Sequence, residues 1–173
     1  MNSRRPIFHR GVLDLGLETA SLPNGLTVEL PVIRHPGAAA IVALDERQRV
    51  AMINQYRHAI GGAIWEIPAG ARAEGENPRQ CAARELREEA GVVARSWRRL
   101  ATIVTVPSFC DERITLFLAR QLSATASQHE ADEVIRLRWI PLARALAMIE
   151  HGQIVDAKTI AALYRTQTYL AQG

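Results

Sequence analysis

The stretch that decides the fold is GARAEGENPRQCAARELREEAGV, residues 70–92. Within it, Asn77-Pro78 favours a helix start, because Asn caps free backbone N–H groups and Pro is tolerated at the first helical position. Gly91 suits the position just past a helix C-terminus, where the left-handed conformation that glycine tolerates is common. The sequence therefore predicts a loop over residues 70–76, followed by a helix over residues 77–90.

Three carboxylates stand together on this predicted helix. Glu85, Glu88 and Glu89 are spaced i, i+3 and i+4, so their side chains share one helical face. Like charges this close repel one another, and a divalent cation removes the repulsion because hard oxygen ligands suit Mg²⁺ or Mn²⁺. The alternative is a solvated face on which Arg84 and Arg87 pair with the carboxylates. The spacing alone leaves both interpretations open.

The composition describes one ordinary globular domain. A chain of 173 residues is long enough for one sizeable core and too short for two full-sized domains. No apolar run is long enough to cross a bilayer, and the first residues lack the apolar core of a signal peptide. We therefore expect a cytoplasmic protein with no membrane partner. Cys81 and Cys110 form no disulfide or zinc pattern, so both are expected to be reduced thiols.

The charge pattern suits small phosphorylated ligands better than nucleic acid. The net charge is only +3, and Lys158 is the single lysine among the basic residues. Arginine favours bidentate contacts with phosphate. No basic stripe with interleaved aromatic residues is present, so no nucleic-acid partner is expected.

Hydrophobic patterning outside residues 70–92 predicts alternating strands and helices. Residues 11–35 predict an antiparallel hairpin about the turn Pro23-Asn24-Gly25. Further strands are expected within residues 38–45, 49–57, 63–70, 97–106, 113–122 and 134–140, and further helices within residues 141–151 and 157–170. This order favours an α/β (α+β) fold in which a mixed sheet lies between helices.

The constrained positions of the opening stretch resemble the Nudix box. That pattern is Gly, five residues, Glu, seven residues, Arg-Glu, an aliphatic residue, any residue, Glu-Glu, any residue, Gly and an aliphatic residue. The nine constrained positions are all filled, by Gly70, Glu76, Arg84, Glu85, Leu86, Glu88, Glu89, Gly91 and Val92. Nine matches make the signal specific. The resemblance implies a Nudix hydrolase with an α-β-α sandwich, from a family that cleaves nucleoside diphosphates linked to another group.

The resemblance implies a set of metal ligands. Glu85 and Glu89 would be the principal ligands of Mg²⁺, with Mn²⁺ as a possible substitute. Glu88 would be shared or bridged by water, and the backbone carbonyl of Ala69 would complete the set. All three glutamates would thus belong to the catalytic site.

The remaining box residues would support these ligands. By the same resemblance, Arg84 is a catalytic-site residue held by Glu76, which fixes the loop against the helix. Glu76 could instead only complement the dipole of the helix N-terminus. Gly70 and Gly91 would be structural, because a tight turn and a helix end both favour glycine.

Segments outside the box resemble the ADP-ribose pyrophosphatase branch of the family. They are QYRHAIGGAIWEIPAGA (55–71), VPSFCDERITLFLAR (106–120) and EADEVIRLRWIPLARALAMIEHGQIVDAKTIAALY (130–164). In that branch a proline follows the box, and Pro107 lies 15 residues beyond Val92. The loop from Pro107 to Glu112 departs from the glycine-containing loop usual there.

This branch implies further site residues. Glu133, in an acidic loop late in the chain, would be the general base, with Glu130 as the alternative. The acidic loop could instead be only a charged turn that precedes a strand. Arg57 would contact the diphosphate, and Glu66 and Glu112 would line the substrate pocket. Each of these last three could instead form an ordinary salt bridge at a strand edge.

The resemblance also implies an assembly and a reaction. Residues 1–36 would form N-terminal strands that build a two-fold homodimer, and residues 37–173 would form the Nudix domain. The expected reaction is metal-dependent hydrolysis of ADP-ribose to AMP and ribose 5-phosphate. Alternatives are a nucleotide-sugar or dinucleotide pyrophosphatase, for example on GDP-mannose, and a non-catalytic module that senses a nucleotide.

Overall fold

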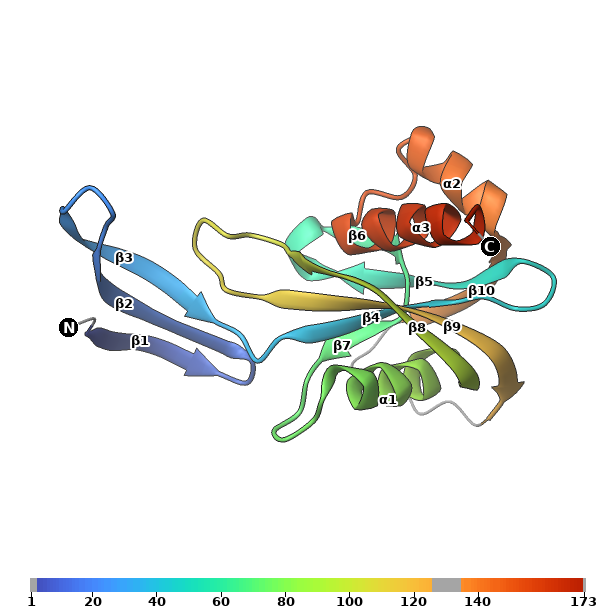
Figure 1. The fold of residues 1–173 in the computed structure, drawn as a ribbon, viewed down its shortest axis with the longest axis horizontal. Helices are drawn as coiled ribbons and strands as arrows, with labels where there is room; N and C mark the ends of the chain where they lie inside the picture. The colour runs from blue at the N-terminus through green and yellow to red at the C-terminus, as the bar shows by residue number, and fades with distance from the viewer. Residues whose placement is uncertain (1–2, 126–134, 173) are drawn as a thin grey trace.

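The computed structural model describes residues 3–125 and 135–172 (Figure 1). Its elements are β1 (Arg4–Arg10), β2 (Leu13–Ser21), β3 (Thr27–Arg34), β4 (Ala38–Ala43), β5 (Arg49–Arg57), η1 (His58–Ile60), β6 (Gly62–Glu66), β7 (Ala69–Ala71), α1 (Pro78–Ala90), β8 (Val92–Val104), β9 (Arg113–Ala124), β10 (Ile135–Pro141), α2 (Leu142–Glu150) and α3 (Ala157–Leu170). The predicted box helix and both predicted C-terminal helices are confirmed. None of the helices within the described ranges combines the length and apolar character that spanning a membrane requires.

Three sheets organise the chain. Their strand orders are β1-β2-β3, β10-β5-β6 and β7-β4-β9-β8. Strands β4 and β9 pair in parallel, whereas the other strand pairs of the described chain are antiparallel. The prediction of a mixed sheet is therefore confirmed.

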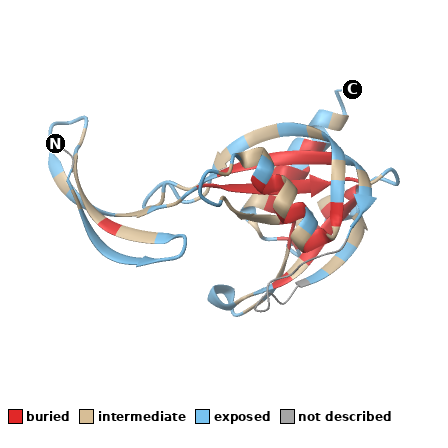
Figure 2. Cartoon of the chain, turned by 90° about the horizontal axis from the view of Figure 1, so that it is seen from below, coloured by how far each residue is buried: buried red, intermediate tan, exposed pale blue. Residues whose placement is uncertain are grey.

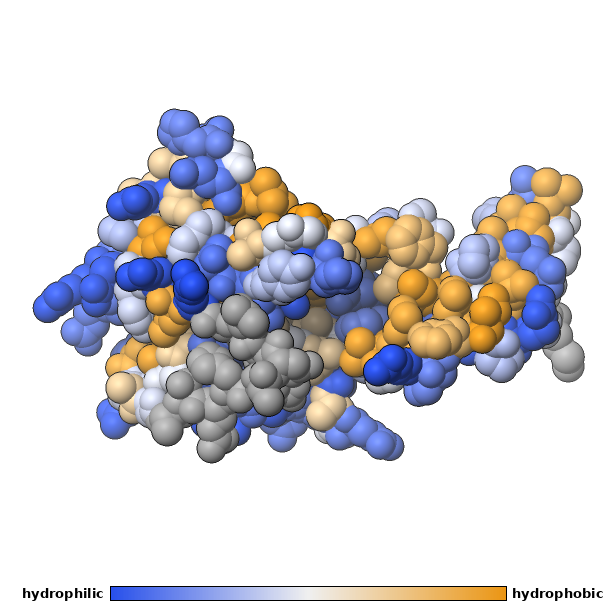
Figure 3. All heavy atoms as spheres, turned by 180° about the vertical axis from the view of Figure 1, so that it is seen from behind, coloured by the Kyte–Doolittle hydropathy of each residue, from blue (hydrophilic) through white to orange (hydrophobic). Residues whose placement is uncertain are grey.

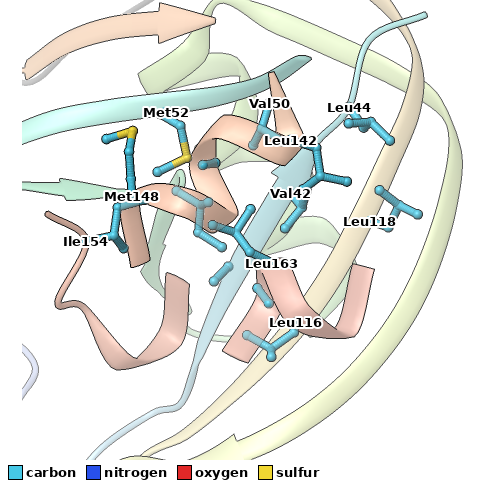
Figure 4. Close-up of a cluster of buried hydrophobic side chains, with 14 of the residues drawn as sticks. Val42, Leu44, Val50, Met52, Leu116, Leu118, Leu142, Met148, Ile154 and Leu163 are labelled. Carbon is cyan, nitrogen blue, oxygen red and sulfur yellow. The ribbon is translucent and has the colours of Figure 1, made fainter. Parts of the chain in front are cut away.

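Strand β4 lies between two hydrophobic cores. All six of its residues are buried, and successive side chains alternate between opposite faces. Ala38, Ala40 and Val42 pack with residues of α2 and α3 in the core that Figure 4 shows in part. Ala39 and Ile41 pack with α1 on the other side. Helix α1 thus covers one face and α2 and α3 cover the other, which gives the expected α-β-α sandwich (Figure 1).

Helix α1 forms as the sequence predicts. The Asn77 side chain accepts hydrogen bonds from the backbone N–H groups of Arg79 and Gln80, and the Gln80 side chain closes a capping box. Gly91 ends the helix in the left-handed conformation, at φ +61°. The apolar face of α1, which includes Cys81 and Leu86, is buried against the sheet. This packing fixes the position of the polar face.

The predicted strand over residues 63–70 is in fact two strands. Strand β6 ends at Glu66, and β7 begins at Ala69 in a different sheet. Between them, the Ile67 N–H donates to the Thr159 hydroxyl at 3.0 Å, and the Pro68 carbonyl accepts from the Ile41 N–H at 2.8 Å. These long-range partners replace regular strand pairing, so the chain can pass from one sheet to the other.

The predicted N-terminal hairpin is confirmed as β2 and β3, and a further strand, β1, precedes it. Strand β1 adds to β2 through a short turn at Gly11, which has a φ of +58°. Arg4 secures the extra strand by binding Asp14 and Glu18 at 2.7 and 3.2 Å. The pairing register shifts after Pro6, as expected where proline interrupts an edge strand. Figure 2 shows this sheet extending away from the main domain with almost no buried residue.

A short joint connects the N-terminal sheet to the main domain. Arg34, at the end of β3, binds Glu18 at 2.5 Å and Asp111 at 2.9 Å. The Ile33 N–H donates to the Phe109 carbonyl at 2.7 Å, and its carbonyl accepts from the Asp111 N–H. The loop between β8 and β9 therefore holds the base of the sheet.

Acidification is expected to loosen this joint. Hydrogen bonding from Arg34 lowers the pKa of Glu18. Burial opposes ionisation of Asp111, but hydrogen bonds from Arg34 and the His35 N–H outweigh it and lower that pKa also. A carboxyl with a depressed folded pKa stabilises the fold above its unfolded pKa, and this contribution is lost as the pH falls through the folded pKa.

Amide hydrogen exchange measures the effect. Protection factors at Ile33 and Asp111 should fall below about pH 4, whereas those in β4 should hold. Arg34→Gln should give low protection at Ile33 at every pH. Equal losses in β4 and at the joint would contradict the prediction.

Candidate active site

Arg84 ties the box loop to the box helix. Its Nε and Nη2 donate to the two carboxylate oxygens of Glu76, both at 3.0 Å, and Nη2 also donates to the Ala71 carbonyl at 2.9 Å. The hydrogen bond from Arg84 lowers the pKa of Glu76, and the same bond raises the pKa of Arg84. Glu76 also accepts from the Ala73 N–H at 2.9 Å. These contacts favour a bracing role for Glu76 over simple complementarity to the helix dipole.

The three glutamates of α1 face two different partners. Glu85 and Glu88 accept from Arg84 Nη1 at 2.5 and 3.1 Å. Glu89 accepts from the Ala69 N–H at 2.8 Å. Glu85 and Glu89 are 8% and 3% exposed, so the interpretation as a solvated face fails for these two. Within the described ranges, no three His, Cys, Asp or Glu side chains converge as a preformed metal cluster.

Gly70 makes room for Glu85. A Cβ atom at position 70 would lie 2.0 Å from Glu85 Oε1 and 2.2 Å from its carboxyl carbon. Glycine is therefore required because the carboxylate occupies that space, not because of a positive φ. Cys81 lies behind the loop, with Sγ 3.4 Å from the Gly70 carbonyl oxygen, and burial raises the pKa of Cys81 to about 12. Such a thiol is a core residue and no nucleophile.

The donor set suits a divalent cation. Glu85, Glu88 and Glu89 offer hard oxygen atoms on one helical face, and the backbone at Ala69 is hydrogen-bonded directly to one of them. The nearby guanidinium of Arg84 offsets only part of the negative charge of four carboxylates, Glu76 included. The remaining negative charge would attract a divalent cation, and the carboxylate oxygen atoms would coordinate it. We therefore conclude that the residues fit the implied metal.

A cavity of about 420 Å³ lies beside the box loop. Its walls join segments that are far apart in the sequence. They comprise His35, Ala38, Arg57, Ala69, Gly70, Ala71, Thr105, Val106, Glu112, Ile114, Asp156, Ala157 and Lys158. The structure thus brings Arg57 and Glu112 to the same cavity as Ala69 and Gly70.

Glu66 lies behind the cavity wall and organises it. It is 2% exposed, and it binds Arg57 through two hydrogen bonds of 2.7 and 2.9 Å. Lys158 contacts the same carboxylate. Burial opposes ionisation of Glu66, but the hydrogen bonds from Arg57 and the attraction of Lys158 outweigh it and lower the pKa. The expectation that Glu66 lines the pocket is therefore replaced by a supporting role beneath Arg57.

Lys158 and Asp156 are site residues that sequence reasoning missed. Asp156 caps α3 by accepting from the Thr159 N–H at 3.0 Å, and it also binds Lys158 at 3.0 Å. Their signal in the sequence was an Asp cap before a helix together with the single lysine of the chain. Neither feature indicates a distant partner, and Glu66 lies 92 residues before Lys158.

The other predicted residues have different outcomes. Glu112 accepts from the Thr105 hydroxyl at 2.6 Å and lies 3.7 Å from the His35 ring, so it belongs to the cavity wall. Glu130 and Glu133 lie outside the described residues. His35 and Thr105 carried no recognisable signal in the sequence.

Comparison with known proteins identifies the family. The model of the NUDIX domain matches residues 34–163. The chain is 35% identical to the ADP-ribose pyrophosphatase of Bacillus subtilis (strain 168), over 95% of this chain and 90% of that protein. It is 38% identical to the methanol dehydrogenase activator of Bacillus methanolicus, over 93% of this chain and 88% of that protein.

A solved structure agrees with the fold. "Crystal structure of ADP compounds hydrolase" superposes with a TM-score of 0.84, covering 99% of this chain and 94% of that one at 19% sequence identity. Nudix enzymes bind nucleoside diphosphate substrates and typically depend on a divalent metal. The box geometry, the matching domain and the relatives agree, and the chain belongs to the Nudix family of hydrolases.

Proposed function

We propose that this protein hydrolyses the pyrophosphate bond of ADP-ribose to AMP and ribose 5-phosphate, with Mg²⁺ or Mn²⁺ as cofactor. The observation that carries the proposal is the cavity of about 420 Å³ that joins Arg57 to the box loop. A diphosphate bound there would lie between a guanidinium and the carboxylate-bearing helix. The name of the Bacillus subtilis relative, an ADP-ribose pyrophosphatase, supports the substrate.

The metal would be held by the box. Glu85, Glu89 and the Ala69 carbonyl are the proposed ligands, with Glu88 shared or bridged by water. When bound, the cation neutralises phosphate oxygens and makes water a better nucleophile at neutral pH. Arg84 pairs with two of these carboxylates, Glu85 and Glu88, and also binds the Ala71 carbonyl, so it holds the helix against the box loop.

Arg57 is the proposed diphosphate contact. Glu66 engages one edge of its guanidinium through Nε and Nη2, and the side chain remains 40% exposed. A guanidinium has five donors, so Arg57 keeps donors for phosphate while Glu66 fixes its orientation. Glu112, which lines the same cavity, is a further proposed substrate contact.

Glu133 is the proposed general base, with Glu130 as the alternative. The chemistry requires a carboxylate within hydrogen-bond reach of the attacking water. Glu133→Gln should lower kcat with little change in KM. An unchanged kcat would transfer the role to Glu130.

We further propose that the N-terminal sheet, within residues 1–36, forms a homodimer. Figure 3 shows apolar surface on this sheet. The exposed apolar residues there are Ile7, Phe8, Val12, Leu13, Leu26 and Leu30. An open sheet edge with exposed apolar side chains favours association. The partner's sheet is the proposed occupant of this surface.

Turnover tests the reaction directly. With Mg²⁺, the protein should release AMP and ribose 5-phosphate from ADP-ribose, measured by liquid chromatography and mass spectrometry, and EDTA should abolish release. Glu89→Gln should fold normally and lose at least about a hundredfold in kcat, whereas the exposed control Glu46→Gln should keep it. Faster cleavage of GDP-mannose under the same conditions would reject ADP-ribose as the preferred substrate.

Gly70→Ala tests the geometry of the loop. The new methyl group would displace the carboxylate of Glu85, which is the end of a flexible side chain, so the melting temperature should change little. The displaced ligand should lower kcat by at least about tenfold. Gly62→Ala is the matched control, because its Cβ meets no atom within 4 Å. Full activity in Gly70→Ala would remove Glu85 from the proposed ligands.

Light scattering after size-exclusion chromatography tests the dimer. At micromolar concentration the mass should be twice 19.1 kDa. Ile7→Glu with Phe8→Glu should shift the protein to monomer, whereas Val93→Glu, exposed on β8, should not. A monomeric wild type would reject the proposal.

A further inference from the structure

A second concavity, of about 480 Å³, lies beside the β3–β4 connection, of which His35, Pro36 and Gly37 line it. It shares only His35 and Ala38 with the first cavity. Arginine dominates its walls: Arg34, Arg72, Arg99 and Arg113 all line it, and the single acidic residue there is Asp111.

Within residues 3–125 and 135–172, few acidic groups pair with the arginines of this concavity. Asp111 is already engaged by Arg34, which also binds Glu18. Among the residues that the structure describes, Arg72, Arg99 and Arg113 form no ion pair within 4.0 Å. Like charges gathered in one concavity raise the local potential and attract anions.

Neutral groups hold two of these guanidinium groups in place. Arg72 donates from Nε to the Glu76 carbonyl at 2.7 Å and from Nη1 to the Pro36 carbonyl at 3.4 Å. Its side chain lies across Gly37, where a Cβ atom would approach Arg72 Cδ to 3.7 Å. Arg99 donates to the Thr102 hydroxyl at 2.8 Å. These acceptors orient the side chains and leave their charge intact.

Paired strands β8 and β9 form one wall of the concavity, and their register shifts between Arg99 and Ala101. Thr102 pairs with Thr115, and Arg99 pairs with Phe117, so they stand on the face that packs toward α1. Arg113 lies two residues before Thr115 on β9, so its side chain points to the same face. One strand pair therefore presents two arginines and two threonines to one space.

We propose that this concavity is a second ligand site, which binds the phosphate group of a small phosphorylated molecule. Guanidinium groups match phosphate through paired N–H donors, and hydroxyl groups of threonine supply further contacts. Its volume exceeds that of a single phosphate ion, so a larger phosphorylated molecule fits. The site includes neither Arg57 nor any of the proposed metal ligands, and it does not depend on which substrate the enzyme cleaves.

Calorimetric titration with inorganic pyrophosphate tests the proposal. The titration uses EDTA and an Arg57→Gln background, which removes the proposed diphosphate contact of the active site. The Arg57→Gln variant should bind one pyrophosphate per chain. Adding Arg99→Gln and Arg113→Gln to this variant should weaken pyrophosphate binding at least about tenfold. Separate titrations with orthophosphate and AMP show whether the part of the ligand beyond one phosphate group adds affinity.

The matched control removes the same charge from the opposite face of the same strands. Arg98 pairs with Leu118 and Arg120 pairs with Ser96, on the face toward α3. Arg98→Gln with Arg120→Gln should change the affinity by less than about threefold. Equal weakening by both double substitutions, or no binding in the Arg57→Gln background, would overturn the proposal.

Chemical labelling of the wild type gives an independent measurement. Phenylglyoxal modifies accessible guanidinium groups, and mass spectrometry locates them. Pyrophosphate should protect Arg99 and Arg113 and leave Arg98 and Arg120 reactive. If Arg99 and Arg113 instead became less reactive as the protein concentration rose, without pyrophosphate, a second copy of the chain would cover this surface. That result would overturn the proposal. Hydrolysis of ADP-ribose, measured separately, is expected to persist in the Arg99→Gln, Arg113→Gln protein.

Discussion

The guanidinium of Arg84 is the interaction on which the rest of the site depends. Four carboxylates of the box lie close together, and two of them are nearly buried. Ionised carboxylates in that setting are costly unless a cation and hydrogen bonds compensate them. Arg84 contacts Glu76, Glu85 and Glu88 at once, and it also binds the Ala71 carbonyl. The box can therefore keep its charge concentrated while its loop and helix stay in register.

The sheet explains why two helices from opposite layers serve one site. Strand β4 is short and rich in alanine, so α1 and α3 both approach it closely. The polar side of α1 then faces β7, and the N-terminus of α3 reaches the break between β6 and β7. The box carboxylates come from α1 and Lys158 comes from α3. The cavity therefore forms only when both helices are packed on the sheet.

Local signals predicted much of the fold, and long-range contacts determined what they missed. Asn77-Pro78 and Gly91 mark the bounds of α1 because capping and glycine conformation are local effects. Strand β1 escaped prediction because Pro6 interrupts its pattern and Arg4 finds its partners only after pairing. In the site, the box residues followed from spacing. The support of Arg57 by Glu66 and Lys158 could not, since it joins strands and a helix that meet only in the folded chain.

The hydrogen bond between the Ile67 N–H and the Thr159 hydroxyl has a consequence for how the chain tolerates shortening. Thr159 is fully buried, and Asp156 fixes its hydroxyl while capping α3. A C-terminal deletion that ended before this helix would retain every residue of the box. It would nevertheless remove the hydroxyl group that accepts from the Ile67 N–H. Ile67 lies where the chain passes from β6 to β7, three residues before Gly70. The position of the box loop is therefore expected to depend on the last tenth or so of the polypeptide, although the box itself ends at Val92.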